Sequence, residues 1–280
     1  MATKIFTPSM LRGAGTRGVP EIPVGSSFTN TYSMEFDGVD EYFNTEFVAP
    51  SGDFTLSYWL KSDGATFGGE NNQAYPVSIA VGGVNYGTGK ISYANSSGRA
   101  QWGVGTQAYA QDGTGVGKYS TWRGQTELDD SVWHHIMQVY KTGGTNTTFW
   151  YVDGAVETLD HWSDGSECTI TNQAVNLTKR LGIGADFDTY AYRYGELRGW
   201  VDEVAIFGAD ESSNISTIYN GGTPGDLTSL SPLGWWRRGD AASWDAGTGI
   251  WTLTDQGSEG DDGTSNNMEE ADRDTDVPPT

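Results

Sequence analysis

The residues best suited to acid–base chemistry at neutral pH are three histidines, His134, His135 and His161. His134 and His135 are neighbours in Val132–Lys141, a stretch typical of a β-strand, so their side chains are expected on opposite faces of a sheet. They therefore cannot act as a pair on one substrate. The sequence holds no Gly-x-Ser-x-Gly turn that would present a nucleophilic serine beside them. The histidines are predicted to be structural residues of a core strand.

Two carboxylates at alternate positions of one strand, Glu35 and Asp37, are a second candidate for catalysis. A retaining glycoside hydrolase needs two carboxyl groups about 5–5.5 Å apart. Gly38 and Val39 interrupt the strand directly afterwards, where such a pair would need it to continue. The chain is therefore predicted not to be an enzyme, and a glycan-cleaving activity remains the third alternative.

Aromatic side chains in loops could stack on sugar rings, provided that polar groups lie beside them. Each such residue has a second interpretation as a core residue, because large aromatic side chains are usually buried. The residues assigned on this basis to glycan binding are Tyr75, Trp102, Trp122, Trp162, Tyr190 and Tyr192.

Short strands and tight turns must position these residues. The chain of 280 residues contains 39 glycines, 12% aromatic residues and only 19% charged residues, a composition that favours strands over helices. In Phe54–Ser62 apolar and polar residues alternate, and Asp153-Gly154 is a two-residue hairpin signal. One helix is expected over Ser212–Asn220, ended by glycines, and residues 106–131 are expected to form a long loop. The sequence therefore predicts an all-β protein, a two-sheet antiparallel jelly-roll sandwich with one short helix.

The two ends of the chain differ from this middle part. Residues 1–31 show no periodicity and are expected to be an extended arm, followed by a jelly roll over residues 32–226. Residues 227–280 form a third region, with four tryptophans and an acidic end. Trp235 and Trp236 are predicted to dock on the jelly roll or on another subunit and are assigned to assembly. Deletion of residues 227–280 is expected to leave a soluble domain.

Charge and cysteine content exclude several classes of function. The formal net charge of −21 argues against binding to nucleic acid or to an anionic membrane. Cys168 is the single cysteine, so no intrachain disulfide can form. Neither a secretory signal peptide nor an apolar run of about 18 residues is present in the sequence. No membrane insertion is expected.

Several segments carry a resemblance when they are taken in order. They are Ser33–Tyr42 (SMEFDGVDEY), Phe54–Lys61 (FTLSYWLK), Trp133–Tyr140 (WHHIMQVY), Phe149–Gly154 (FWYVDG), Leu181–Gly184 (LGIG), Gly199–Phe207 (GWVDEVAIF) and the helix end Tyr219–Gly222 (YNGG). This series resembles laminin-G-like domains of the concanavalin A-like superfamily. The resemblance implies a jelly roll with a concave and a convex face. It also implies a structural calcium ion, for which Asp37 and Asp202 are the candidate ligands, and no other cofactor.

Residues 227–280, with Trp-Trp-Arg-x-Gly-Asp at their start, resemble C-terminal extensions of laminin-G-like structural proteins of marine bacteriophages. This resemblance implies a virion subunit, assembled in the host cytoplasm as a capsid decoration, fibre or tail component. Its expected partners are other virion proteins, further copies of the chain and host-surface polysaccharide. The alternative is a carbohydrate-binding module of a microbial surface protein.

Overall fold

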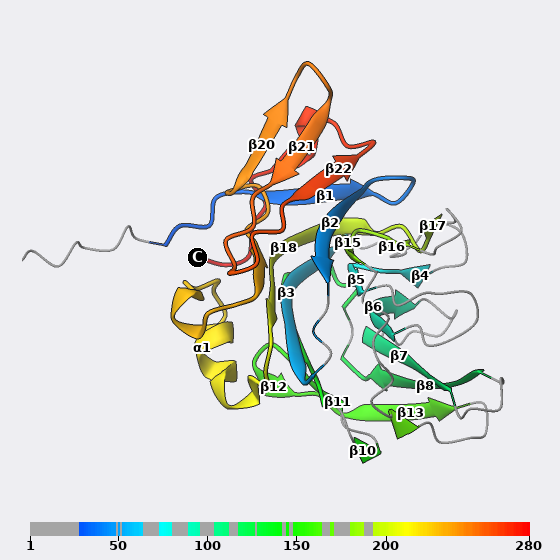
Figure 1. The fold of residues 1–280 in the computed structure, drawn as a ribbon. Helices are drawn as coiled ribbons and strands as arrows, with labels where there is room; N and C mark the ends of the chain where they lie inside the picture. Colours follow the sequence, from blue (N-terminus) through cyan, green and yellow to red (C-terminus); the bar gives the residue numbers. More distant parts are fainter. Residues whose placement is uncertain are drawn as a thin grey trace, which may run out of the picture.

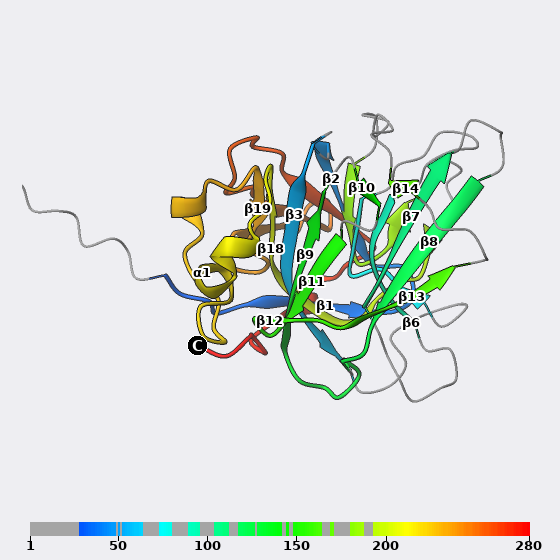
Figure 2. The same cartoon turned by 90° about the horizontal axis from the view of Figure 1, so that it is seen from below.

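A computed structural model describes residues 28–48, 50, 52–63, 73–79, 89–95, 104–111, 117–126, 128–141, 144–145, 148–163, 169–170, 180–187 and 193–280. These residues form layered antiparallel sheets with one short α-helix at the side (Figures 1 and 2). The predicted all-β sandwich is confirmed. No helix in the described part of the chain is long and apolar enough to cross a membrane.

The largest sheet has eight strands and contains both the opening and the closing strand of the predicted jelly roll. Its order is β12 (Ala155–Val156), β11 (Thr148–Val152), β9 (His134–Tyr140), β3 (Phe54–Ser62), β18 (Arg198–Phe207), β1 (Ser33–Asp37) and β23 (Arg273–Asp274), with β19 (Gly234–Trp236) also paired to β18. Asp153 and Gly154 connect β11 to β12 with positive φ angles of 50° and 76°, as the predicted hairpin turn requires.

The opposing sheet has six strands. They are, in order, β20 (Ala242–Asp245), β21 (Ile250–Leu253), β22 (Gly263–Asn266), β2 (Tyr42–Val48), β15 (Arg180–Ile183) and β5 (Val77–Ile79). The hairpin of β20 and β21 projects from the body of the molecule at the top of Figure 1. A strand from the end of the chain, β22, thus pairs with β2 from its beginning.

Five more strands form a separate sheet in the order β13 (Leu159–Ser163), β8 (Gly117–Gly124), β7 (Val104–Gln111), β6 (Gly89–Asn95) and β4 (Gln73–Ala74). Two further pairs are β10 (Gly144–Thr145) with β14 (Thr169–Ile170), and β16 (Asp186–Phe187) with β17 (Arg193–Tyr194). The expectation of a long loop over residues 106–131 is wrong, because most of β7 and all of β8 lie there. Their sequences, VGTQAYAQ and GKYSTWRG, contain few large apolar residues, so the alternation that marks a strand is weak.

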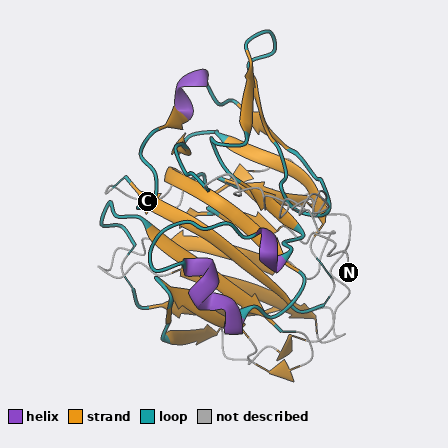
Figure 3. Ribbon diagram, turned by 90° about the vertical axis from the view of Figure 1, so that its left-hand side faces the viewer, coloured by secondary structure: helices purple, strands orange, loops and turns teal. Residues whose placement is uncertain are grey.

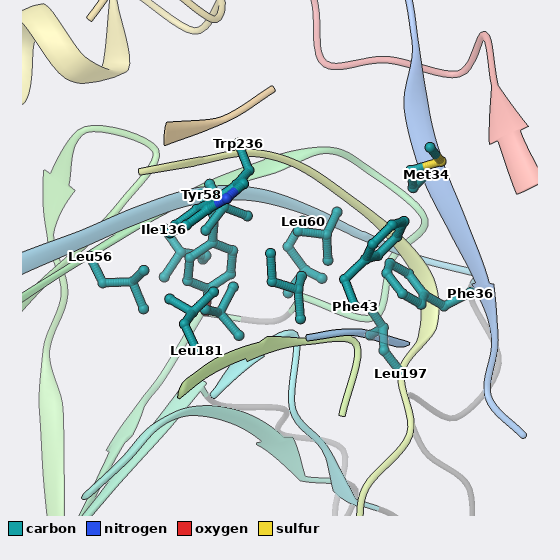
Figure 4. Close-up of a cluster of buried hydrophobic side chains, with 14 of the residues drawn as sticks. Met34, Phe36, Phe43, Leu56, Tyr58, Leu60, Ile136, Leu181, Leu197 and Trp236 are labelled. Carbon is teal, nitrogen blue, oxygen red and sulfur yellow. The ribbon is translucent and has the colours of Figure 1, made fainter. Parts of the chain in front are cut away.

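The main core lies between the two larger sheets. Phe54, Leu56, Tyr58 and Leu60 of β3 belong to this core, as the alternation predicts. The residues between them, Thr55, Ser57 and Trp59, alternate with them along the strand. Figure 4 shows part of this cluster, in which the Trp236 ring lies among side chains of the central strands.

A second, smaller apolar cluster covers the outer face of the large sheet. It joins residues of β9 and β18 to Ile218 of α1 (Ile215–Tyr219), to Leu227 and to Trp235. The short helices η1 (Ser212–Asn214), α1 and η2 (Thr228–Leu230) lie against this face, whereas η3 (Glu270–Asp272) precedes β23 (Figure 3). The predicted helix over Ser212–Asn220 is present as η1 followed by α1.

Residues 227–280 are part of both sheets. β19 extends the large sheet from β18, β23 pairs with β1, and β22 pairs with β2. Trp235 and Trp236 dock on the jelly roll, the first of the two predicted alternatives, and are only 4% and 0% exposed within this chain. This burial leaves them little surface for the predicted contact with another subunit. The structure argues against the expectation of a soluble domain without residues 227–280, since the deletion would remove strands from both sheets.

Candidate functional site

A bulge in β18 brings two acidic residues into the interior. The pairing of β18 with β3 shifts register between Asp202 and Ala205, and Glu203 has a φ of 49°. The Glu203 carboxylate accepts hydrogen bonds from Trp235 Nε1 (2.8 Å) and Arg237 Nε (3.1 Å). Burial raises the pKa of Glu203 to about 7, against the opposing effect of Arg237. Glu203 therefore ties the closing strand to residues 235–237.

Residues 235–240, here called the clasp, hold the first described residues of the chain. Arg237 Nη2 donates to the carbonyl oxygen of Thr29, and the guanidinium lies 4.2 Å from the ring centroid of Phe28. Asp240 Oδ2 accepts hydrogen bonds from the backbone N–H groups of Thr31 (2.9 Å) and Tyr32 (3.4 Å).

Gly239 of the clasp has a φ of 73°, and a Cβ added there would lie 2.7 Å from the carbonyl carbon of Tyr32. Only glycine suits this position, because it combines the left-handed backbone with the close approach. The Trp-Trp-Arg-x-Gly-Asp sequence thus has a local structural role, which is to fasten residues 28–32 to the body of the domain.

Asp202 is completely buried beside the clasp. Its Oδ2 accepts a hydrogen bond from Asn30 Nδ2 and its Oδ1 one from the backbone N–H of Glu203, each at 2.8 Å. Burial, with a further contribution from Glu203, raises the pKa of Asp202 well above its usual range. A carboxyl group with these partners is a structural acceptor.

The structure does not bring the two predicted calcium ligands together. Asp37 pairs with Arg198 in β18, four residues before Asp202, which corresponds to a separation of about 13 Å along the strand. Asp37 instead accepts a hydrogen bond from the backbone N–H of Val39 at 2.7 Å. A single ion cannot bind both carboxylates. In the described residues no group of three or more His, Cys, Asp or Glu side chains could hold a metal ion.

A pocket of 530 Å³ opens next to the clasp. Three parts of the chain line it: the first described residues, the turn after α1 and the C-terminus, which Figures 1 and 2 also place side by side. The lining residues are Phe28, Thr29, Asn30, Thr31, Asn220, Thr223, Pro224, Gly225, Asp226 and Thr280.

The turn after α1 is held by its own side chains. Asn220 ends the helix in the left-handed conformation, with a φ of 48°, and its Nδ2 donates to Thr223 Oγ1 at 3.1 Å. Asp226 Oδ1 accepts a hydrogen bond from the backbone N–H of Thr228 at 2.9 Å. Hydrogen bonds from the Thr228 side chain and backbone lower the pKa of Asp226, so this exposed carboxylate is ionised at neutral pH.

Asn30 is the buried residue of the pocket wall on the other side. It is 8% exposed, and its Oδ1 has no hydrogen-bond partner among the described residues. A buried amide oxygen without a donor is uncommon, because leaving it unpaired costs about 1–3 kcal/mol. The wall of the pocket therefore contains an unused acceptor.

Of the residues assigned to glycan binding, Tyr75 is excluded because its side chain is 1% exposed. Trp122 in β8 pairs with His161, and Trp162 in β13 pairs with Thr121, so the two tryptophans are not partners in the register, and their assignment to glycan binding stays a prediction. Trp102, Tyr190 and Tyr192 lie outside the described residues.

His134 and His135 face opposite sides of the large sheet, as expected. His134 lies between Asp153 and Asp130, with nitrogen–oxygen distances of 2.8 and 3.2 Å, and His135 Nε2 is 2.9 Å from Ser57 Oγ. Burial lowers the pKa of His135 to about 4. Both Ser57 and His135 are buried, at 2% and 0% exposure, so a substrate cannot reach them.

The opening strand ends beside another acidic pair. Glu41 accepts a hydrogen bond from the backbone N–H of Asp37 at 2.7 Å, and its side chain is also hydrogen-bonded to Asp272 of η3. Burial, together with the charges of Asp272 and Asp37, raises the pKa of Glu41 to about 8. Burial, followed by the charge of Asp274, likewise raises the pKa of Glu35.

Sequence reasoning missed the pocket. The turn that lines it reads Asn-Gly-Gly-Thr-Pro-Gly-Asp, residues 220–226, and its sequence predicts only the end of a helix. The density of Asn, Gly, Pro and Asp in a connection was the available signal, because functional side chains are often carried by such loops.

No protein-family model and no curated protein matches the chain. Among solved structures, a candidate carbohydrate-binding protein of Bacteroides ovatus is 14% identical, with 90% of this chain and 62% of that protein covered and a TM-score of 0.50. Domains LG4-5 of the mouse laminin alpha1 chain are 12% identical, covering 64% and 41%, with a TM-score of 0.36. Tailspike protein 2 of an Escherichia coli O157:H7 bacteriophage is 13% identical, covering 70% and 28%, with a TM-score of 0.44.

The chain spans less than two thirds of the length of each of these structures. At 14% identity, the likeness to the Bacteroides protein supports the sandwich fold alone.

Proposed function

We propose that the chain is a non-enzymatic, glycan-binding adhesion subunit of a bacteriophage particle. The glycan part of the proposal rests on the 530 Å³ pocket, whose walls combine apolar surface with polar side chains, and on a fold shared with a candidate carbohydrate-binding protein. Pockets of this size commonly hold small ligands.

The surroundings of the candidate catalytic groups support a role without catalysis. Asp37 is engaged by the turn at Val39, and the Ser57–His135 pair is closed off from solvent. Glycan hydrolysis would require two accessible carboxyl groups beside one sugar. Turnover of a panel of algal and bacterial polysaccharides, lost on Glu35→Gln, would contradict a binding role.

The particle assignment draws on the resemblance of residues 227–280 to extensions of phage structural proteins. In the domain these residues complete both sheets, so they belong to the folded subunit that would be incorporated. The expected partners are other virion proteins and further copies of the chain.

Two measurements test the proposal. The full chain is applied to an array of microbial-surface and host glycans, where saturable binding is expected. Purified particles are analysed by mass spectrometry, where the chain is expected at a defined copy number. Glycan binding without particle association would favour the carbohydrate-binding module of a microbial surface protein. A chain that binds no glycan on the array is not an adhesin of this kind.

A further inference from the structure

We propose that the pocket beside the clasp binds an uncharged sugar unit of a glycan, with Asn220 and Asp226 accepting hydrogen bonds from its hydroxyl groups. This inference rests on the proposed glycan-binding function and names its site and its ligand class. Nothing in the laminin-G resemblance points to this face, which lies between the end of α1 and the first described residues.

The polar groups of the turn after α1 suit hydroxyl groups. A carboxylate can accept about four hydrogen bonds, and the Asp226 carboxylate receives two, both from Thr228. Asn220 uses its Nδ2 to bind Thr223, and its Oδ1 has no donor among the described residues. Both side chains are exposed at the pocket, so hydroxyl donors of a bound sugar could reach these acceptors.

The opposite wall supplies a third acceptor. Asn30 lines the pocket, and its Oδ1 is buried without a partner in the described part of the chain. A ligand or water donor placed there by a small shift of the wall would satisfy it. This observation is independent of the turn, because Asn30 belongs to the segment held by the clasp.

The pocket is held in shape before any ligand arrives. The Phe28 ring stacks on Trp235, with centroids 6.2 Å apart, and Arg237 covers it at 4.2 Å. Thr29 and Thr31 are fixed by backbone hydrogen bonds to Arg237 and Asp240. Walls that are already ordered lose little conformational entropy on binding, which favours recognition of a small, rigid ring.

The charge of the pocket favours neutral sugars over acidic ones. The described lining residues contain no Lys, Arg or His, and they include the ionised Asp226. The charge of the nearby Arg237 contributes to the lowered pKa of Asp226, but its guanidinium donates its hydrogen bonds to Glu203 and to the carbonyl oxygen of Thr29. A sugar that carries a carboxylate or sulfate would meet the negative charge of Asp226 and would find no cation in the pocket lining to pair with. Neutral hexoses and N-acetylhexosamines are therefore favoured over uronic and sialic acids.

The experiment measures binding of single sugars to the full chain by saturation-transfer NMR. The neutral probes are the methyl glycosides of glucose, galactose and N-acetylglucosamine, and the acidic probes are glucuronic acid and N-acetylneuraminic acid. At least one neutral probe is expected to bind and the acidic probes are not. Asp226→Asn is expected to weaken neutral binding roughly tenfold, because a charged acceptor becomes a neutral one. Asn220→Gly, which keeps the left-handed backbone, should also weaken it.

Asp245→Asn is the matched control. Asp245 is also an exposed aspartate that accepts a hydrogen bond from the backbone N–H two residues later, but it lies in the turn between β20 and β21. This variant is expected to bind the neutral probe as the unchanged chain does. Neutral binding that is equal in Asp226→Asn, Asn220→Gly and the control overturns this site, as does binding of acidic probes alone. Binding of the full chain to the glycan array is measured separately. A failure of this site can therefore be distinguished from a failure of the proposed glycan-binding function.

Discussion

Arg237 and Arg238 are adjacent in sequence and have opposite surroundings. On the outer side of the large sheet, Arg237 donates to Glu203 and to the carbonyl oxygen of Thr29, and it lies over an aromatic ring. On the inner side, Arg238 is 0% exposed, and none of its guanidinium nitrogens has a hydrogen-bond partner among the described residues. Its guanidinium lies 5.1 and 4.7 Å from the ring centroids of Phe36 and Phe43.

The comparison separates two ways of burying a charge. Arg237 is compensated by a carboxylate and a carbonyl group, whereas Arg238 has only the faces of two aromatic rings. Burial lowers the pKa of Arg238 to about 9, with Asp202 acting in the opposite direction. Because the pKa of Asp202 is itself raised well above its usual range, this carboxyl group is a weak counter-charge. Burial of the Arg238 charge therefore destabilises the domain, because hydrogen bonds do not compensate for its lost hydration as they do at Arg237.

The largest effect is expected from Arg237→Met. The substitution leaves the Glu203 carboxylate buried without its cation, which should lower the free energy of unfolding by about 3 kcal/mol. Urea denaturation at pH 8 measures this decrease in the free energy of unfolding. Arg198→Met is the control, because Arg198 forms an exposed ion pair with Asp63 and should lose less than about 1 kcal/mol. Equal losses in the two variants would mean that Arg237 is not the essential partner of Glu203.

Arg238→Met should change the free energy of unfolding in the opposite direction to Arg237→Met. Methionine fills the space between Phe36 and Phe43 without a charge to desolvate, so the free energy of unfolding should rise by about 1–2 kcal/mol. The same denaturation measurement applies, with Arg238→Lys as the comparison that keeps the charge and is not expected to stabilise. A clear loss of stability in Arg238→Met would show that internal water or an ion solvates the guanidinium.

The smallest effect extends the comparison from buried cations to buried carboxyl groups. The pKa of Glu41 is raised to about 8 in the folded chain, above its usual value of 4.5, so folding retains a proton that the unfolded chain releases. Its contribution to stability is complete below pH 4.5 and is lost as the pH rises to 8. Glu203 contributes in the same direction up to about pH 7. The unchanged chain should therefore melt at a lower temperature at pH 8 than at pH 5.

Glu41→Gln isolates this contribution. The amide mimics the protonated acid, so the decrease in melting temperature between pH 7 and pH 8 should become smaller, with little change at pH 5. Glu270→Gln, at an exposed glutamate of the nearby η3, is the control and should leave the decrease as it is. If the two variants behave alike, the proton is not held at Glu41.

Elements that are encoded by local patterns could be predicted from the sequence. The alternation in Phe54–Ser62 predicts a strand with those bounds, and Asp153-Gly154 predicts the hairpin of β11 and β12. The helix that ends at Asn220 is predicted from the glycines that follow it in the sequence. In these cases the residues that determine the structure are neighbours in the chain.

The candidate site could not be predicted in this way, because its contacts join distant residues. Asn30 is hydrogen-bonded to Asp202, which lies 172 residues away in the sequence. Arg237 is hydrogen-bonded to the carbonyl oxygen of Thr29, 208 residues away. Trp-Trp-Arg-x-Gly-Asp is a conspicuous motif, but its sequence does not reveal that its partner is the segment before β1. The Arg-Arg pair shows the same difficulty, since neither residue identifies which side of the sheet will supply its partners.

The pairing of β23 with β1 has a consequence for the synthesis of the protein. Ser33 of β1 is hydrogen-bonded to Asp276, 243 residues further along the chain. At about 5–20 residues per second, a ribosome takes roughly 12–50 s to make the intervening polypeptide. During this interval the outer edge of β1 has no strand beside it, and such an edge invites pairing with other nascent chains. Recombinant yield should therefore depend on expression temperature and chaperone supply more than the stability of the finished domain would suggest.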